Sequence, residues 1–159
     1  MRNYFYHMEI TETGIPCMVA EKGTYKVDMR MRYDSPEKIV ELVSEIGLCN
    51  RAEEYVYAAY FDTHCKLIGL CEISHGTVNM SPLSPREVMQ RALLLGATSF
   101  ILIHNHPSGV VEPSIYDDEV TKRINEAGNL LGICLNDHVI IGKEFGSIFH
   151  YSYREQGKI

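Results

Sequence analysis

The sequence predicts an α/β (α+β) domain in which helices flank a mixed β-sheet. Three observations predict it: helix start and stop signals recur along the chain, short apolar runs lie between them, and 159 residues suffice for one hydrophobic core. Hydrophobic residues make up 45% and charged residues 23% of the chain, which is ordinary for a globular protein. The chain therefore needs neither disulfides nor a metal simply to fold.

The first 34 residues are the least strongly patterned part of the chain. Turn signals at Thr13-Gly14 and Lys22-Gly23 separate short mixed runs. They predict that residues 1–34 form a β-rich N-terminal extension, with the main domain at residues 35–159.

The main domain opens with a capped helix and a hairpin. Ser35-Pro36 is a helix start, Gly47 is a stop, and an apolar stripe lies between them at Ile39, Val40, Val43 and Ile46. Two strand-like runs, Tyr55–Phe61 and Leu67–Ile73, follow and are joined by a short polar turn at residues 62–65.

Two more helices and the remaining strands follow. Ser84 to Glu87 is a capping box, and Gly96 ends a second helix with an apolar stripe at Val88, Ala92 and Leu93. The run 99–103 then predicts a buried central strand. A third helix is expected from Ser114 to Gly128, followed by short strands at 132–135, 139–141 and 148–151.

Charge and cysteine usage exclude some classes of protein. The net charge is −6 and the longest run of basic residues is the pair Lys122-Arg123, so strong binding to duplex DNA is not expected.

The five cysteines lack Cys-x-x-Cys spacing, which predicts reduced, mostly buried thiols. Without an apolar leader or a run long enough to span a membrane, a cytoplasmic protein with no membrane association is expected. The oligomeric state stays open.

The segment from Ile103 to Gly109 carries the most chemical information. In an extended chain, residues two apart point to the same side, so His104 and His106 can bind one ion while Asn105 faces away. Pro107 cannot continue the strand pairing, which places both histidines at the strand end. His-x-His alone is weak evidence, because histidines are common inside and outside cores.

A carboxylate in the first turn of the third helix completes the pattern. Asp117 follows a loop that contains Gly and Pro, and with Ser114 it equally predicts a helix cap. We expect both roles, because capping fixes the geometry that ligation requires. Two histidines, one carboxylate and a vacant fourth position describe an open catalytic zinc site. A non-haem iron site uses the same ligand types, so metal content would separate the two.

The spacing His104-x-His106-Pro107, six residues, Ser114-x-x-Asp117 resembles the JAMM motif of the JAB/MPN metalloprotease superfamily. Within it, residues 35–159 are most similar to a RadC-like JAB domain. The matching segments are Glu54 ahead of a strand that ends in Asp62, residues 75–77, 85–87, 104–109 and 113–114, Asp117, and residues 137–142.

The resemblance implies a fold similar to that of cytidine deaminases, one Zn²⁺ per chain and a glutamate base before the first hairpin. Glu54 fits that place, with Glu53 as the alternative. This base takes a proton from the water that zinc activates and passes it to the leaving nitrogen. Ser114 stabilises the oxyanion. The implied activity is hydrolysis of a peptide or isopeptide bond in a peptide or protein substrate.

Other interpretations remain beside the hydrolase. RadC proteins usually carry a helix-hairpin-helix segment, which the first 34 residues do not resemble. A catalytically silent zinc-containing interaction module, acting in DNA repair or mobile-element biology, is the alternative function.

Four further candidate ligands are assigned to the surface or to outer positions around the metal: His64, Glu72, His75 and His138. Asp137 and His138 are expected to fix a turn or to orient a metal ligand.

Overall fold

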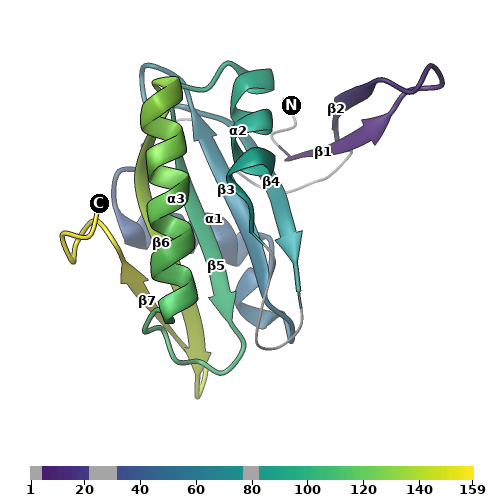
Figure 1. Ribbon diagram of the computed structural model, residues 1–159. Helices are drawn as coiled ribbons and strands as arrows, with labels where there is room; N and C mark the ends of the chain where they lie inside the picture. The colour runs from purple at the N-terminus through teal and green to yellow at the C-terminus, as the bar shows by residue number, and fades with distance from the viewer. Residues whose placement is uncertain (1–4, 22–31, 77–82) are drawn as a thin grey trace.

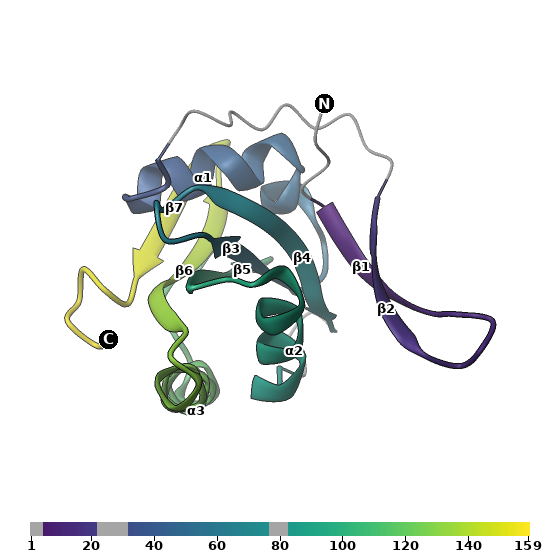
Figure 2. The ribbon, with the colours of Figure 1, turned by 90° about the horizontal axis from the view of Figure 1, so that it is seen from above.

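The computed structural model describes residues 5–21, 32–76 and 83–159. A seven-stranded mixed sheet forms its centre, in the order β2-β1-β4-β3-β5-β6-β7. Helix α1 covers one face of the sheet, and α2 and α3 lie side by side on the other (Figures 1 and 2). The predicted class, a mixed sheet flanked by helices, is confirmed. The elements are β1 (Phe5–Ile10), β2 (Pro16–Ala20), α1 (Pro36–Glu45), η1 (Leu48–Asn50), β3 (Tyr55–Phe61), β4 (Leu67–His75), α2 (Pro85–Leu95), β5 (Ser99–His106), α3 (Ile115–Leu131), β6 (Cys134–Glu144) and β7 (Ser147–Ser152).

Strand β5 lies inside the sheet, antiparallel to β3 and parallel to β6. Its side chains alternate between two buried clusters, because successive residues of a strand point to opposite faces. Ile101 and Ile103 belong to the cluster beneath α1, and Phe100 and Leu102 to the cluster beneath α2 and α3. We call these the α1 face and the α2–α3 face. By the same alternation, His104 and His106 belong to the α2–α3 face.

The N-terminal residues form a hairpin at one edge of the sheet (Figure 2). Strands β1 and β2 pair antiparallel, and the predicted turn contains Gly14 at φ +78°. Strand β1 then pairs in parallel with β4 through Phe5–Leu70 and Tyr6–Cys71. The extension therefore adds two strands to the main sheet. The second predicted turn, at Lys22-Gly23, lies outside the described residues.

The predicted helix starts are largely as expected, with two corrections in α2. Ser35 precedes α1 and Ser84 precedes α2, each followed by proline at the first helical position. The Ser84 hydroxyl accepts a hydrogen bond from the Arg86 N–H, and not from that of Glu87 as a capping box requires. Leu93 is 58% exposed, while Val88, Met89 and Ala92 are buried. The buried stripe of α2 therefore passes through Met89 and not through Leu93.

The predicted end of α3 at Gly128 is wrong. The helix continues to Leu131, and Gly132 ends it at φ +71°. A Cβ atom on Gly128 would lie 2.4 Å from the carbonyl oxygen of Ile133. Glycine stands here because the chain that enters β6 crosses close to the helix, and not because the helix stops.

We expect Gly128→Ala to destabilise the fold by about 1–3 kcal/mol, because the added methyl overlaps backbone that cannot move freely. Helix propensity alone predicts the opposite, a gain of about 1 kcal/mol for alanine over glycine. Urea unfolding measures the difference. Leu130→Ala, at a side chain that is 86% exposed, is the control and should be near neutral. A stabilised Gly128→Ala variant would show that the close approach is not restrictive.

Strand β6 is continuous, whereas the sequence predicted two short runs with Asp137 and His138 at a turn between them. Phe100 pairs with Leu135 but Ile101 pairs with Asp137, so Asn136 is the extra residue of a β-bulge. The bulge reverses the alternation: Leu135 belongs to the α2–α3 face, and Val139 belongs to the α1 face. His138 consequently shares the α2–α3 face with the histidines of β5.

The cysteines are all free, as expected, but they are not mostly buried. Only Cys71 is buried, while Cys65 and Cys134 are exposed. Cys65 lies in the β3–β4 turn at φ +58°, and Cys134 begins β6 at the rim of the sheet. Within the described residues, no helix combines the length and the apolar character that a membrane crossing requires.

Candidate metal centre

Strand β5 presents His104 and His106 at its last residues, before Pro107. The strand is longer than the predicted 99–103, so both histidines are paired with neighbouring strands: His104 lies opposite Val56 of β3 and Ile140 of β6. His104 is 1% exposed, and its Nε2 lies 2.9 Å from Nε2 of His106. The two imidazoles thus converge on one point.

The loop after β5 fixes the ring of His106. Nδ1 of His106 lies 2.6 Å from the carbonyl oxygen of Val110, which can only accept, so Nδ1 carries the proton and Nε2 is unprotonated in the neutral ring. This loop packs tightly on β6, where a Cβ on Gly142 would lie 2.2 Å from the carbonyl oxygen of Gly109. Glycine at 142 therefore lets the loop reach the position that orients His106.

Asp117 enters the site from the first turn of α3. Ser114 and Asp117 form a complete capping box, in which Asp117 Oδ2 accepts from the Ser114 N–H at 2.7 Å and from its hydroxyl at 2.6 Å. The other oxygen, Oδ1, lies 3.5 Å from His104 Nε2, and Oδ2 lies 3.8 Å from His106 Nε2. The cap thus holds the carboxylate beside both imidazoles.

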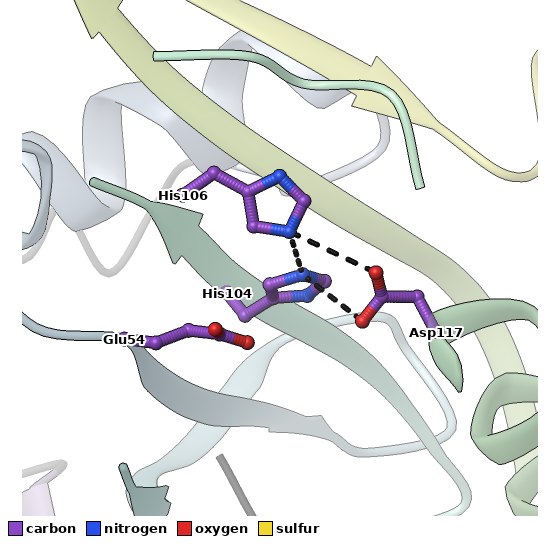
Figure 3. Close-up of side chains that lie close together, drawn as sticks. All are labelled: Glu54, His104, His106 and Asp117. Carbon is purple, nitrogen blue, oxygen red and sulfur yellow. Dashed lines mark hydrogen bonds and ion pairs between the residues drawn. The ribbon is translucent and has the colours of Figure 1, made fainter. Parts of the chain in front are cut away.

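Glu54 completes the group from the segment before β3. Its carbonyl oxygen accepts from the N–H of Gly76 at 2.9 Å, and its side chain points toward His104 (Figure 3). One potential ligand atom from each of Glu54, His104, His106 and Asp117 lies within 4.8 Å of all the others. In the described part of the chain, this is the one group of His, Cys, Asp and Glu side chains close enough to share a metal ion.

Glu53, the alternative base, points elsewhere. Its carboxylate contacts Nε2 of His75 at 2.5 Å, and both side chains are about half exposed. The structure therefore brings Glu54 to the histidines and leaves Glu53 at the surface.

Burial shapes the electrostatics of the group. It raises the pKa of the Glu54 carboxyl to about 7, and the negative charge of Asp117 adds to the effect. Burial lowers the pKa of His104 to about 4, so this imidazole is neutral and able to bind a metal at neutral pH. Two carboxyl groups beside two imidazoles form a donor set that favours a cation.

A model of the RadC-like JAB domain matches residues 33–158. The chain belongs to this family. It is 43% identical over 122 residues to a UPF0758 protein of Finegoldia magna, covering 73% of this chain and 54% of the relative. It is also 43% identical over 123 residues to a UPF0758 protein of Caldanaerobacter subterraneus (77% and 51%), and 40% identical over 122 residues to one of Streptococcus gordonii (77% and 52%). The chain spans about half the length of these curated relatives.

Membership in the RadC-like JAB family confirms the resemblance found in the sequence. The family match and the four converging side chains together establish a JAB domain with a group of residues able to hold a metal ion.

Asn105 is a site residue that sequence reasoning placed only as facing away from the histidines. It is 3% exposed, and its side chain clamps the backbone on both sides of Glu54: Oδ1 accepts from the Tyr55 N–H at 2.8 Å, and Nδ2 donates to the Glu53 carbonyl at 2.9 Å. Asn105 thereby links the histidine strand to the glutamate. This contact depends on the pairing of β3 with β5, which brings together residues about fifty apart in sequence. No local sequence pattern therefore predicts it.

We expect Asn105→Ala to lower the free energy of unfolding by about 2–3 kcal/mol, because two buried hydrogen bonds are lost and two backbone groups lose their partners. Hydrogen exchange at the Tyr55 amide should accelerate relative to neighbouring β3 amides. Asn129→Ala, at an exposed position of α3, is the matched control and should change stability by less than about 0.5 kcal/mol. Unchanged exchange at Tyr55 would contradict the clamp.

The raised pKa of Glu54 predicts a pH-dependent stability in the metal-free protein. A carboxyl whose pKa is higher in the folded than in the unfolded state favours folding while protonated, so the free energy of unfolding should fall as pH rises from about 4.5 to 7. We expect this fall to be about 1–3 kcal/mol larger in the wild type than in Glu54→Gln. Urea unfolding at pH 5 and pH 8 with chelator present measures it. Parallel pH profiles for the two proteins would contradict a raised pKa.

The remaining candidate ligands lie apart from the group of four. His64 is exposed in the β3–β4 turn, Glu72 accepts a hydrogen bond from the Tyr57 hydroxyl, and His75 pairs with Glu53. His138 is fully buried and lies behind His104, with its Nε2 at 2.8 Å from His104 Nδ1. It contacts a candidate ligand without joining the group.

Proposed function

We propose that this RadC-like JAB domain is a zinc-dependent hydrolase of the JAMM type that cleaves a peptide or isopeptide bond. The observation that supports it most is the position of Glu54: a second carboxylate lies beside a set of two histidines and one aspartate. A catalytic site keeps three protein ligands and an open fourth position, and amide hydrolysis also needs a base close to the attacking water; we assign Glu54 to that base and not to a fourth ligand.

His104, His106 and Asp117 are the three protein ligands in this proposal, and the fourth position stays open to water and substrate. A zinc ion in such a site supplies a nucleophilic water at neutral pH and polarises the carbonyl group under attack. Glu54 accepts the proton of the attacking water and then donates it to the leaving nitrogen. In the metal-free site burial raises the pKa of this carboxyl to about 7, and a nearby cation favours the carboxylate form that accepts the proton.

Ser114 is proposed to stabilise the oxyanion. Its hydroxyl proton is directed at Asp117 Oδ2 in the structure, at 2.6 Å. Donation to a substrate oxygen therefore requires the hydroxyl to rotate, after which the Ser114 N–H still holds the same carboxylate oxygen. Ser114 would thus cap helix α3 before the reaction and donate its hydroxyl hydrogen to the substrate oxygen during it.

The proposed partner is a peptide or protein, and binding to duplex DNA is proposed to be weak at physiological salt because the net charge is −6.

To test the proposed function, zinc-loaded protein is incubated with a proteome-derived peptide library that also contains isopeptide-linked peptides. Mass spectrometry should find new termini that are absent with chelator and absent with Glu54→Gln. A zinc-loaded protein that produces no such termini would favour the catalytically silent interaction module.

A further inference from the structure

A continuous chain of hydrogen bonds runs behind His104, on the side away from the other imidazole. The Thr121 hydroxyl lies 2.5 Å from the Asp117 backbone carbonyl and 2.6 Å from Nδ1 of His138. Nε2 of His138 lies 2.8 Å from Nδ1 of His104. Thr121, His138 and His104 are each at most 2% exposed, so water does not complete or replace these bonds.

The direction of every hydrogen in this chain follows from its first member. A carbonyl oxygen can only accept, so the single Thr121 hydroxyl proton is donated to Asp117. The hydroxyl must then accept from His138, which places a proton on Nδ1 of His138. In a neutral ring Nε2 of His138 is therefore an acceptor, and Nδ1 of His104 must donate to it. His104 is left with an unprotonated Nε2, the nitrogen that faces His106 and Asp117.

Two features of the fold keep His138 in this role. The bulge at Asn136 brings its side chain to the α2–α3 face, and the Tyr153 ring stacks on it at a centroid distance of 5.0 Å and an angle of 12°. Asp137 secures the strand, since its Oδ1 accepts from the N–H groups of His138 and Arg154 and its Oδ2 accepts from the Ser152 hydroxyl.

The consequence for the metal centre is an arrangement set before any ion binds. In its neutral form His106 likewise has an unprotonated Nε2, because its Nδ1–H is donated to Val110. Two nitrogen lone pairs thus face each other at 2.9 Å, beside a carboxylate. Such a contact is repulsive unless a cation lies at the point where the lone pairs meet.

We propose that Thr121 and His138 are positioning residues that hold His104 in the Nδ1-protonated tautomer and thereby set the metal affinity of the site. The inference rests on the proposed metal centre. It goes beyond that proposal because neither residue is a ligand, and because it assigns a specific proton position to each ring.

The test compares Thr121→Val with Thr121→Ser. Valine keeps the shape of threonine but removes the acceptor for the His138 Nδ1–H, whereas serine retains it. Without this acceptor His138 can place its proton on Nε2, toward His104, and His104 must then carry its own proton on the metal-facing nitrogen. We expect the Kd for zinc, measured by competition with a chromogenic chelator, to rise ~10–100-fold in Thr121→Val, as for other outer-sphere changes. Thr121→Ser should stay within about threefold.

A second measurement needs neither zinc nor substrate. Long-range ¹H–¹⁵N correlation spectra of the zinc-free protein at pH 8 report which ring nitrogen carries the proton. Wild type and Thr121→Ser should show His104 and His138 protonated at Nδ1, and Thr121→Val should show the His104 proton moved toward Nε2. The wild-type spectrum alone decides the tautomer even if the valine variant does not fold.

Protonation of wild-type His104 at Nε2, or a folded Thr121→Val variant with wild-type zinc affinity, would overturn the proposal. If instead the tautomers are as expected and the wild type binds no zinc, the positioning chain stands and the metal-dependent function fails. The two proposals are thus separable.

Discussion

Glu54→Gln should retain zinc and lose amide hydrolysis by ~10²–10⁴-fold, toward the upper end of the range for general acid–base catalysis. The amide of glutamine still accepts a hydrogen bond from water, so the local geometry survives. It cannot take the proton, and it therefore fails in both attack and departure of the leaving group. The measurement is the rate at which a peptide found in the library screen is cleaved, together with the zinc content of the same preparation.

Glu53→Gln is the matched control, one residue away. Its carboxylate contacts exposed His75 and not the histidine pair, so the variant should stay near wild type. If Glu53→Gln lost activity and Glu54→Gln kept it, the segment before β3 would carry the base on its other residue. If neither lost activity, the assignment of a glutamate base would fail.

His106→Ala should abolish stoichiometric zinc binding, with a loss of affinity well above the ~10–100-fold typical of residues that only support a ligand. It removes one of the three proposed protein ligands. Among the described residues no imidazole is free to replace it, because the other nearby ring, that of His138, already contacts the back of His104. Competition titration measures the Kd. His64→Ala, at an exposed histidine in the β3–β4 turn, should bind zinc as the wild type does.

Loss of the metal should not unfold the chain. The two apolar clusters on either side of the sheet form without any of the four site residues. We therefore expect zinc-free wild type and His106→Ala to fold alike, while zinc at about 100 times its Kd adds ~2.7 kcal/mol to the wild type alone. Equal stabilisation of both proteins by zinc would place the metal elsewhere.

The parts of the fold that local sequence determines were predictable. Ser35-Pro36 marks a helix start through the proline at the first helical position, and Ser114 with Asp117 marks one through a capping box. The turn after β3 joins two strand-like apolar runs. Gly128 was misinterpreted because a glycine required by a close crossing looks the same as a glycine that ends a helix. The distinction lies in the position of Ile133, which depends on how the chain turns back toward the sheet.

The candidate site was predictable to the extent that its residues form a spaced motif. His104, His106 and Asp117 lie close in sequence, and Glu54 was reached through the resemblance. Asn105 and Thr121 were not predicted as supporting groups, because their partners come from distant segments. His138 was expected to orient a ligand or fix a turn, but its place beside His104 depends on a bulge at Asn136 that no local pattern indicates.

Anomalous diffraction at the zinc edge, from crystals of protein purified without chelator, tests the metal centre most directly. The expected result is one peak per chain among the four side chains, at ~2.0–2.2 Å from Nε2 of His104, Nε2 of His106 and a carboxylate oxygen of Asp117. Glu54 should lie within reach of the open position without binding the metal. The absence of a peak there, or an ion held through Nδ1 of His104, would contradict the account.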